Sequence, residues 1–600
     1  MTRTALKLDL SAVPRHAHST APPSHRAAGD TLPPPTVPRQ RMLATLSFAI
    51  PTALAAMLFF FHLGVYGLWE PDEARYAEIA REMLALRDFV VPHLNYVPYI
   101  EKPPLLYWLT AFSMRLFGVN EFAARLPNAL AALIGVLVTY FFAFRTLGRQ
   151  RAILSAVILA TSGLYALMAQ VLTTDMLLTA TMTAALFAFF LHWRDGGGWC
   201  WLSYAAIGLA VLTKGPVGAA IPLLAGLTFL WWERDLPGAI RRFHLIPGMA
   251  LAAAISLPWF VAITLRQPGF FDFYFIGEHF RRFFESSYSH GQPIYYYVPV
   301  VAAGLLPWTL IVPFIPWRSL ERNPARRFCI ISAAVIFAVF SLARAKLVPY
   351  ILPAIPPLAV LLADRIISFT CRKGETADSR DFYPTVAAPD PRRLAAIGPL
   401  LGLAGAGVIV TALNAHRFAS PNPMLVRQAL YLAGAVVITG GMACLVVFWY
   451  RRVTAGLTVF AATAAATLIV ASYGRILAEP ARSYARLARQ LELRAPNAML
   501  VCYPRYIQSL PFYTRRRVVL VGAKTELAYG AEHAADASEY FFSRRADLLR
   551  LWNQSRPTVI VIDRWALPPL AGSLWPFKVI ASDEKKLAIT HPDTARDGNR

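Results

Sequence analysis

Five short polar motifs interrupt the apolar stretches of this sequence and carry the groups that can do chemistry. Ionisable side chains beside a bilayer are costly, so their default interpretation is functional. Cations suit a phosphate leaving group, whose developing charge needs preorganised positive partners, and carboxylates suit a sugar hydroxyl, an amino group or an oxocarbenium-like centre. The motifs are Trp69-Glu70-Pro71-Asp72-Glu73, Glu101-Lys102-Pro103-Pro104, the turn ending in Asp175, Glu278-His279-Phe280-Arg281-Arg282, and Arg344-Ala345-Lys346 with Tyr350. Together they predict a substrate with a membrane tail, a phosphate and a sugar.

Each residue also has a purely structural interpretation. Asp72 and Glu73 follow Pro71 at the start of a predicted helix, where acids favour the helix dipole, and Asp175 can cap the span that follows it. Lys102 and Lys346 can be snorkelling anchors, His279 a surface histidine, and Arg281 and Arg282 contacts to lipid headgroups. The functional interpretation depends on all of them sharing one side of the membrane.

The elements that hold these motifs are predicted to be transmembrane helices. Of the 600 residues, 56% are hydrophobic and only 16% charged, whereas a globular domain carries about 25% charged residues. Apolar stretches of roughly 20 residues recur, long enough to cross a hydrocarbon core of about 30 Å. We predict a polytopic α-helical membrane protein with thirteen spans, at 43–68, 122–144, 152–171, 174–192, 199–213, 216–232, 244–265, 295–317, 328–343, 347–364, 394–414, 428–450 and 454–473.

The net charge of +24 indicates membrane topology rather than nucleic-acid binding. Basic residues concentrate in alternate loops, which the positive-inside rule assigns to the cytoplasm. The N-terminus is then cytoplasmic, and the polar motifs share the opposite face. The basic loops hold Arg145, Arg149, Arg151, Arg194, Arg234, Arg241, Arg242, Arg318, Arg322, Arg326, Arg327, Arg451 and Arg452.

Three regions are expected along the chain. Residues 1–41 are rich in Pro, Arg, His and Ser without apolar periodicity and read as a disordered cytoplasmic tail. Residues 42–475 form the transmembrane catalytic region, including periplasmic loops 69–121 and 266–294. Residues 476–600 form a small periplasmic α/β domain, with strands at 499–503, 518–522, 558–563 and 578–581 and a helix at 543–553. In the first loop, an amphipathic helix carrying Tyr76, Ile79 and Met83 on one face is expected to lie in the membrane interface.

The polar motifs resemble those of the bacterial lipid A 4-amino-4-deoxy-L-arabinose transferases, a GT-C family related to the protein O-mannosyltransferases. The resemblance covers about residues 42–590, and its Trp-Glu-Pro-Asp-Glu and Glu-Lys-Pro-Pro motifs are more specific to the family than to the sugar. The matching segments are 67–78, 99–108, 173–175, 278–282, 345–353 and 510–513.

The resemblance implies an inverting transferase of the GT-C type, with undecaprenyl phosphate leaving and a lipid A phosphate attacking on the periplasmic face of the bacterial inner membrane. It suggests Asp72 and Asp175 as the key carboxylates, with Glu73 beside them. It places Lys102, Arg75 and Arg282 near the donor phosphate, with Tyr76 and Tyr99 lining that site. Arg281, Lys346 and Tyr350 complete the predicted substrate-binding set, and no nucleotide cofactor is expected. Glu101 and His279 resemble positions that hold a zinc ion in family members, although two protein ligands make a thin site.

Several functional alternatives remain open from the sequence. A lipid A phosphate is already an anion and needs no general base, whereas a serine or threonine hydroxyl does, so Asp72 is either a base or a contact to the sugar or its oxocarbenium-like centre. A related enzyme moving another sugar, such as mannose, to protein, glycan or another lipid is the second hypothesis. A transporter of lipid-linked sugars is the third, and it is disfavoured because internal repeats and ionisable residues in the middle of the spans are missing.

Overall fold

The computed structural model describes residues 37–281, 292–315, 317, 323–370, 390–414 and 423–592. Its contacts divide the chain into two units, Met1–Leu46 and Ser47–Arg600. The described part of the first unit is the beginning of helix α1 (Val37–Phe60), and residues 1–36 of the predicted tail lie outside the described residues. The following description concerns the second unit.

The chain is a multi-pass membrane protein, as its composition predicts. Within the described ranges, eight helical segments are long and apolar enough to cross a bilayer. They are α4 (Glu121–Leu147), α7 (Thr174–Asp195), α11 (Leu245–Arg266), α14 (Pro324–Leu342), η5 (Val348–Ala354) continued by α15 (Ile355–Thr370), η6 (Pro391–Ala396) continued by α16 (Ile397–Leu413), α17 (Pro423–Trp449) and α18 (Val453–Arg482).

Two further spans are bent, which raises the number to as many as ten. Helices α5 (Arg149–Thr161) and α6 (Gly163–Ala169) meet at 66°, and Ile294–Gly304 and Trp308–Phe314 meet at 101°. Ser162 takes up extended geometry at the first bend, and Pro307, which has no N–H to donate, lies at the second. The count of thirteen stays a prediction, because the remaining expected spans fall on shorter apolar stretches of the described residues. These are Thr45–Phe60 within α1, α8 (Trp199–Lys214) and α9 (Val217–Trp232).

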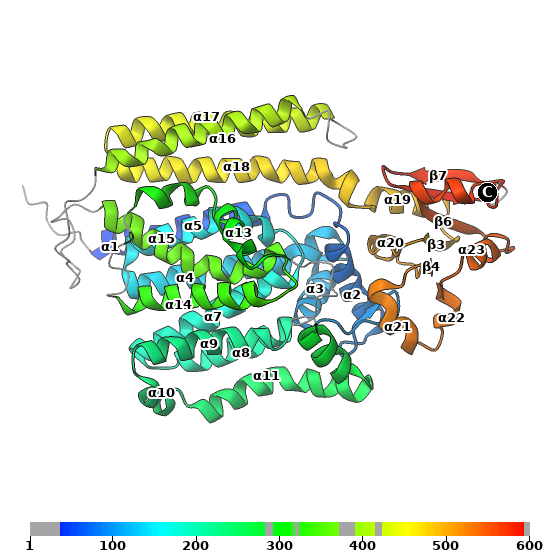
Figure 1. Ribbon diagram of the computed structural model, residues 1–600, viewed down its shortest axis with the longest axis horizontal. Helices are drawn as coiled ribbons and strands as arrows, with labels where there is room; N and C mark the ends of the chain where they lie inside the picture. Colours follow the sequence, from blue (N-terminus) through cyan, green and yellow to red (C-terminus); the bar gives the residue numbers. More distant parts are fainter. Residues whose placement is uncertain are drawn as a thin grey trace, which may run out of the picture. The chain divides into compact units, whose positions relative to one another are not determined.

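Helices α16, α17 and α18 run side by side along one edge of the helical region (Figure 1). Four glycines let the main chains of α16 and α17 touch. A Cβ atom on Gly398 would lie 2.7 Å from the Gly441 carbonyl oxygen, and one on Gly405 would lie 2.8 Å from that of Gly434. Small residues allow this close approach in membranes, where packing rather than the hydrophobic effect holds helices together.

The C-terminal region folds into the predicted α/β structure, a six-stranded sheet in the order β5-β4-β3-β6-β8-β7. Strands β5, β4, β3 and β6 run parallel to one another. Strand β8 pairs antiparallel with β6 on one side and with β7 on the other. The sequence did not predict β5 and β8. The strands are β3 (Met499–Tyr503), β4 (Val519–Val521), β5 (Phe541–Phe542), β6 (Thr558–Asp563), β7 (Lys578–Ser582) and β8 (Lys586–Thr590); the helices include α19 (Ala485–Arg494), α20 (Ser509–Thr514), η8 (Thr525–Leu527), α21 (Ala528–His533), α22 (Ala537–Tyr540) and α23 (Arg545–Trp552).

The first loop holds α2 (Asp72–Leu86), the short hairpin β1 (His93–Leu94) and β2 (Val97–Pro98), and α3 (Leu105–Phe117). The expectation that α2 lies in the membrane interface is corrected here. Its polar face is as buried as its apolar face, with Glu78 and Glu82 both 0% exposed. Arg81 donates to both oxygens of Glu78 at 2.7 Å, and α20 packs against the helix. Protein therefore covers α2.

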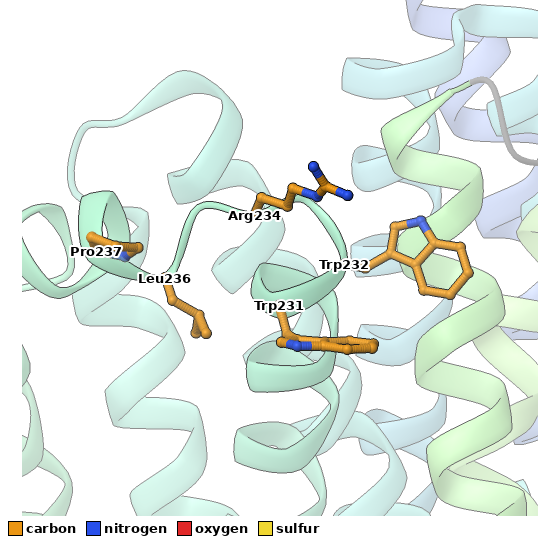
Figure 2. A pocket seen from close by; sticks show the side chains of 5 residues that line it. All are labelled: Trp231, Trp232, Arg234, Leu236 and Pro237. Carbon is orange, nitrogen blue, oxygen red and sulfur yellow. The ribbon is translucent and has the colours of Figure 1, made fainter.

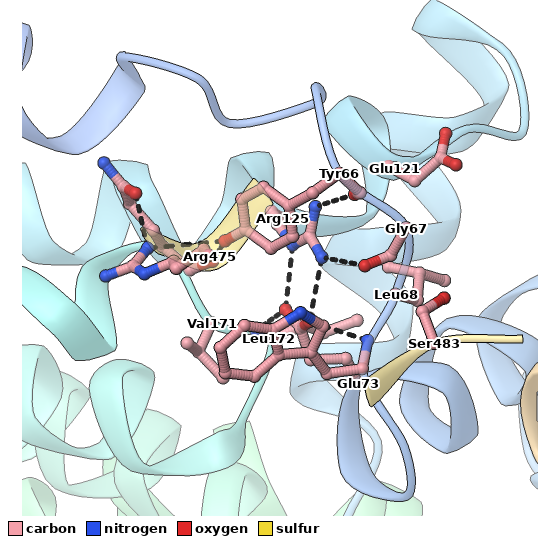
Figure 3. Close-up of polar contacts among 12 residues, drawn as sticks. Tyr66, Gly67, Leu68, Glu73, Glu121, Arg125, Val171, Leu172, Arg475 and Ser483 are labelled. Atoms are coloured by element: carbon pink, nitrogen blue, oxygen red, sulfur yellow. Dashed lines mark hydrogen bonds and ion pairs between the residues drawn. The ribbon is translucent and has the colours of Figure 1, made fainter. Parts of the chain in front are cut away.

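One buried ion pair fastens this loop to the membrane helices (Figure 3). Arg125 of α4 donates to both oxygens of Glu73 at 2.8 Å, and its side chain is 0% exposed. Its remaining N–H groups reach the carbonyl oxygens of Leu63, Tyr66 and Gly67 at 3.1, 2.8 and 3.0 Å. Burial acts to raise the pKa of Glu73, but Arg125 outweighs it and holds that pKa below its ordinary value.

Replacing Glu73 with glutamine should destabilise the protein, because Arg125 would stay buried without its counter-charge. Breaking one partner of a buried pair costs about 3 kcal/mol or more. Thermal unfolding in detergent should therefore show a lower midpoint for Glu73→Gln. Glu492→Gln is the matched control, since Glu492 forms an exposed pair with Arg516. A wild-type midpoint for Glu73→Gln would contradict this role and favour the catalytic one.

Candidate active site

The N-terminal turn of α2 presents the first candidate carboxylate. Asp72 opens the helix directly after Pro71, and its side chain is 55% exposed. Its carboxylate lies 3.5 Å from the guanidinium of Arg75, one turn further along. Asp72 is therefore accessible to a substrate and already paired with a cation.

Two buried phenols show which charges converge around this turn. Burial raises the pKa of Tyr76, and the neighbouring charges of Asp72, Asp175 and Glu101 raise it further while Arg75 lowers it. Burial likewise raises the pKa of Tyr99, with Glu101 adding to the rise and Arg75 opposing it. Four charged residues of the predicted site, from three separate motifs, thus act on the Tyr76 hydroxyl, and two of them, Arg75 and Glu101, also act on Tyr99.

Asp175, in the first turn of α7, completes the pair of predicted carboxylates. Its Oδ1 atom lies 2.5 Å from Nζ of Lys214, and Lys214 also lies over the ring of Tyr350, 4.1 Å from its centre. The helix cap is Thr173, which makes no capping bond with its side chain. The structure thus gives Asp175 an ion-pair partner, and it brings Tyr350 into the same group.

Lys102 and Glu101 lie together on the loop that follows the hairpin. Nζ of Lys102 is 4.0 Å from the Glu101 carboxylate and donates to the Glu101 carbonyl oxygen at 3.1 Å. The Tyr99 hydroxyl donates to the same carboxylate at 2.8 Å. The charge of Glu101 also acts to raise the pKa of Tyr76, as do the charges of Asp72 and Asp175. This shared effect links the segment to the two candidate carboxylates.

Only one of the two residues of the implied zinc site, Glu101, has a described side chain. The Glu101 carboxylate contacts the hydroxyl of Tyr99 and the ammonium group of Lys102. Over the described ranges, no three His, Cys, Asp or Glu side chains gather as a metal site. The backbone of His279 lies in η1 (Asp272–Arg281), but its side chain is outside the described residues. Zinc stays a prediction, and no step below uses a metal.

The other predicted cations are placed less fully. Lys346 is 5% exposed and donates to the carbonyl oxygen of Gln292 at 2.9 Å, and burial lowers its pKa. The side chain of Arg281 and all of Arg282 lie outside the described residues. Their expected contacts with the donor phosphate stay predictions.

Glu73 belongs to a different group from its neighbour Asp72. It is 2% exposed, and besides Arg125 its two oxygens accept the backbone N–H groups of Trp69 at 3.0 Å and Leu172 at 2.9 Å. With both oxygens engaged inside the protein, Glu73 is placed to hold the loop rather than to contact a sugar.

Three residues of this region were not predicted from the sequence. Lys214 could have been found, because it stands in a turn on the same face as Asp175. Arg125 gave only the weak signal of a cation near the start of a span. Glu526 lies 3.9 Å from the guanidinium of Arg75. The sequence could not predict this contact, because Glu526 is far from the first loop along the chain.

A hollow elsewhere in the molecule is separate from these residues. It has a volume of about 520 Å³ and is lined by Trp231, Trp232, Arg234, Leu236 and Pro237. It lies where α9 ends and α10 (Leu236–Arg242) begins, with both indole rings projecting from the helix end (Figure 2). Its lining includes no residue of the predicted site.

The arrangement suits group transfer from a phosphate. Arg75, Lys102 and Lys214 supply fixed cations, each already neighbouring a carboxylate. Preorganised charges of this kind stabilise charge that develops in a transition state without reorganising at that moment. Asp72 is the exposed carboxylate and Asp175 the buried one, so the two offer different environments to one substrate.

Two family models match this chain. Residues 101–261 match the dolichyl-phosphate-mannose-protein mannosyltransferase family. Residues 487–591 match the aminoarabinose transferase C-terminal domain. The second match covers the sheet and most of its helices.

Relatives of known name extend the similarity. The undecaprenyl phosphate-α-4-amino-4-deoxy-L-arabinose arabinosyl transferase of Erwinia tasmaniensis is 34% identical over 404 residues, which cover 65% of this chain and 70% of that protein. The corresponding transferase 2 of Pseudomonas fluorescens is 35% identical over 58% of this chain and 61% of its own length.

Solved structures agree with the fold along nearly the whole chain. ArnT from Cupriavidus metallidurans in the apo state superposes with a TM-score of 0.79 at 27% identity, covering 92% of this chain and 99% of that one. The same protein bound to undecaprenyl phosphate gives a TM-score of 0.78 at 28% identity, with the same coverage.

Proposed function

This chain belongs to the undecaprenyl phosphate-α-4-amino-4-deoxy-L-arabinose arabinosyl transferase family, and we propose that it moves 4-amino-4-deoxy-L-arabinose from undecaprenyl phosphate to a phosphate of lipid A. The observation that carries the proposal is the set of three carboxylate–cation pairs that the motif carboxylates form, Asp72–Arg75, Glu101–Lys102 and Asp175–Lys214. The undecaprenyl phosphate in the related ArnT structure supports the identity of the donor.

The reaction takes place on the periplasmic face of the inner membrane. The basic loops of the sequence lie on the other side of the spans, where the positive-inside rule places the cytoplasm. Arg145 and Arg194, for example, both pair with Asp195 at the end of α7, whereas Asp175 lies at its beginning. The N-terminus is then cytoplasmic, and the C-terminal domain is periplasmic.

The chemistry follows from the charges. The bond between C1 of the sugar and the undecaprenyl phosphate oxygen breaks, while an oxygen of the lipid A phosphate forms a new bond to C1 from the opposite face. The acceptor is already an anion, so no proton needs to be removed. Lys102 and Arg75 stabilise the charge that develops on the leaving phosphate. Asp72 and Asp175 stabilise the oxocarbenium-like centre between the two phosphates.

A second candidate function has support from one specific observation, the mannosyltransferase match over residues 101–261. In that case another sugar would move to a protein hydroxyl, and Asp72 would serve as the general base. The C-terminal match to the aminoarabinose transferases favours the first proposal. Mass spectrometry of lipid A from cells with and without the gene, grown under inducing conditions, would distinguish the two functions.

Asp72→Asn and Asp175→Asn should each remove most of the transfer activity. Asparagine keeps the volume of the side chain but removes the charge that stabilises the oxocarbenium-like centre. The double variant should be little worse than the weaker single variant, since groups that act as a unit are strongly non-additive. The assay is transfer from undecaprenyl-phosphate-linked sugar to lipid A in detergent, measured by mass spectrometry with unfolding midpoints in parallel. Full activity in both single variants would refute this site.

Lys102→Ala should lower transfer about a hundredfold, the effect of losing one preorganised charge partner, with normal insertion into the membrane. Lys578→Ala provides the matched control, because Lys578 is an exposed lysine of β7 and should leave activity unchanged. Wild-type turnover in Lys102→Ala would show that Lys102 is only a snorkelling anchor.

The topology can be tested independently of activity. A reporter that is active only in the periplasm should be active when fused after residue 480 and silent when fused after Arg151. Both fusions should be produced at similar levels on immunoblots. The reverse pattern would overturn the positive-inside argument and place the site on the cytoplasmic face.

A further inference from the structure

The segment that leads into Asp72 is held by the C-terminal part of the chain. The Leu68 N–H donates to the Tyr513 hydroxyl at 2.8 Å, and the Glu70 N–H donates to the carbonyl oxygen of Arg482 at 2.8 Å. Gly67 is pressed so closely against the same region that a Cβ atom there would lie 2.5 Å from Oγ of Ser483. Two residues after Glu70, the chain enters α2 at Asp72.

The Glu70 side chain adds two further hydrogen bonds to these backbone bonds. Its two oxygens accept the backbone N–H groups of Gln508 at 3.1 Å and Ser509 at 2.7 Å. Burial raises the pKa of the Glu70 carboxyl to about 7, while the hydrogen bonds from Ser509 and Gln508 act to lower it. Glu70 therefore ties the loop to the backbone where α20 begins.

The remainder of the loop is attached separately. Asn95, which is 0% exposed, donates to the Val518 carbonyl oxygen at 2.9 Å and accepts the Val518 N–H at 3.0 Å. A Cβ atom on Gly530 would lie 2.5 Å from the Pro98 carbonyl oxygen. Loss of the Glu70 contact alone should thus loosen the segment before Asp72 while the C-terminal domain stays in place.

We propose that Glu70 is a positioning residue for Asp72, through which the C-terminal domain sets the place of the catalytic carboxylate. The inference rests on the proposed function of Asp72 and extends it: the C-terminal domain becomes part of the catalytic apparatus. Glu70 itself contacts no substrate. Its effect is to keep the exposed Asp72 side chain at a fixed position relative to Asp175. The segment before Asp175 is held separately, by the hydrogen bond from the Leu172 N–H to Glu73.

The test compares Glu70→Ala and Glu70→Gln with the control Glu492→Gln in the full-length protein. Misplacing a catalytic group by about 1 Å can cost up to a hundredfold in rate, so we expect Glu70→Ala to lower kcat at least tenfold with KM for the donor nearly unchanged. Glu70→Gln keeps one acceptor oxygen and should fall between Glu70→Ala and wild type. Glu492→Gln removes a carboxylate from the same domain without touching the loop and should be fully active.

Two further measurements separate positioning from other causes. Hydrogen exchange should quicken in Glu70→Ala at residues 69–76 and 508–509, while the unfolding midpoint stays close to that of wild type. In an Asp72→Asn background, Glu70→Ala should cause little further loss of residual transfer. Unchanged exchange at 69–76, unchanged kcat, or an equal loss in the Asp72→Asn background would each overturn the inference. A fully active Asp72→Asn enzyme would instead refute the proposed function, whatever Glu70→Ala shows.

Discussion

The guanidinium of Arg125 is the point on which the geometry of the site depends. All its described hydrogen bonds go to Glu73 or to the chain just before it, and the partner carboxylate also accepts the Leu172 N–H. Asp72 adjoins Glu73, and Asp175 follows Leu172 by three residues. One ion pair therefore holds the backbone segments that lead into both candidate carboxylates. A buried pair of this kind adds little net stability compared with apolar packing, but it selects a single arrangement of the segments that it joins.

Around this fixed point, the charges of the site alternate in sign. Arg75 lies between Asp72 and Glu526, Lys214 meets Asp175, and Lys102 neighbours Glu101. In the absence of substrate each charge is balanced by a neighbour, which limits the cost of placing so many ionisable groups beside a bilayer. A bound phosphate can pair with the cations in place of their carboxylate neighbours, and a developing positive centre can pair with the carboxylates in place of the cations. The same pairs thus supply both signs of charge where charge separates in the reaction.

The sequence predicted what depends on local pattern and missed what depends on distant contacts. Apolar length located the spans, and alternating apolar runs located β3, β4, β6 and β7. β5 is only two residues long and β8 carries lysine at its start, so neither has a strong strand pattern. Motif chemistry brought Asp72, Asp175 and Tyr350 into consideration, and the family resemblance added Tyr76 and Tyr99; the structure joins Asp175 and Tyr350 through Lys214. Lys214 and Glu526 were missed because their relevance arises only from three-dimensional neighbours, and Glu73 next to Asp72 faces another way because successive helical residues point in different directions.

The glycine contact between α16 and α17 has a consequence for biosynthesis. Because the four glycines face one another on two helices that are consecutive in the chain, this close contact forms between neighbours in the order of synthesis. Only 17% of the apolar window of α17 is buried in the folded protein, so most of its surface is suited to acyl chains from the moment it enters the bilayer. The two helices can therefore leave the insertion machinery as a finished hairpin, against which α18 docks when its synthesis is complete.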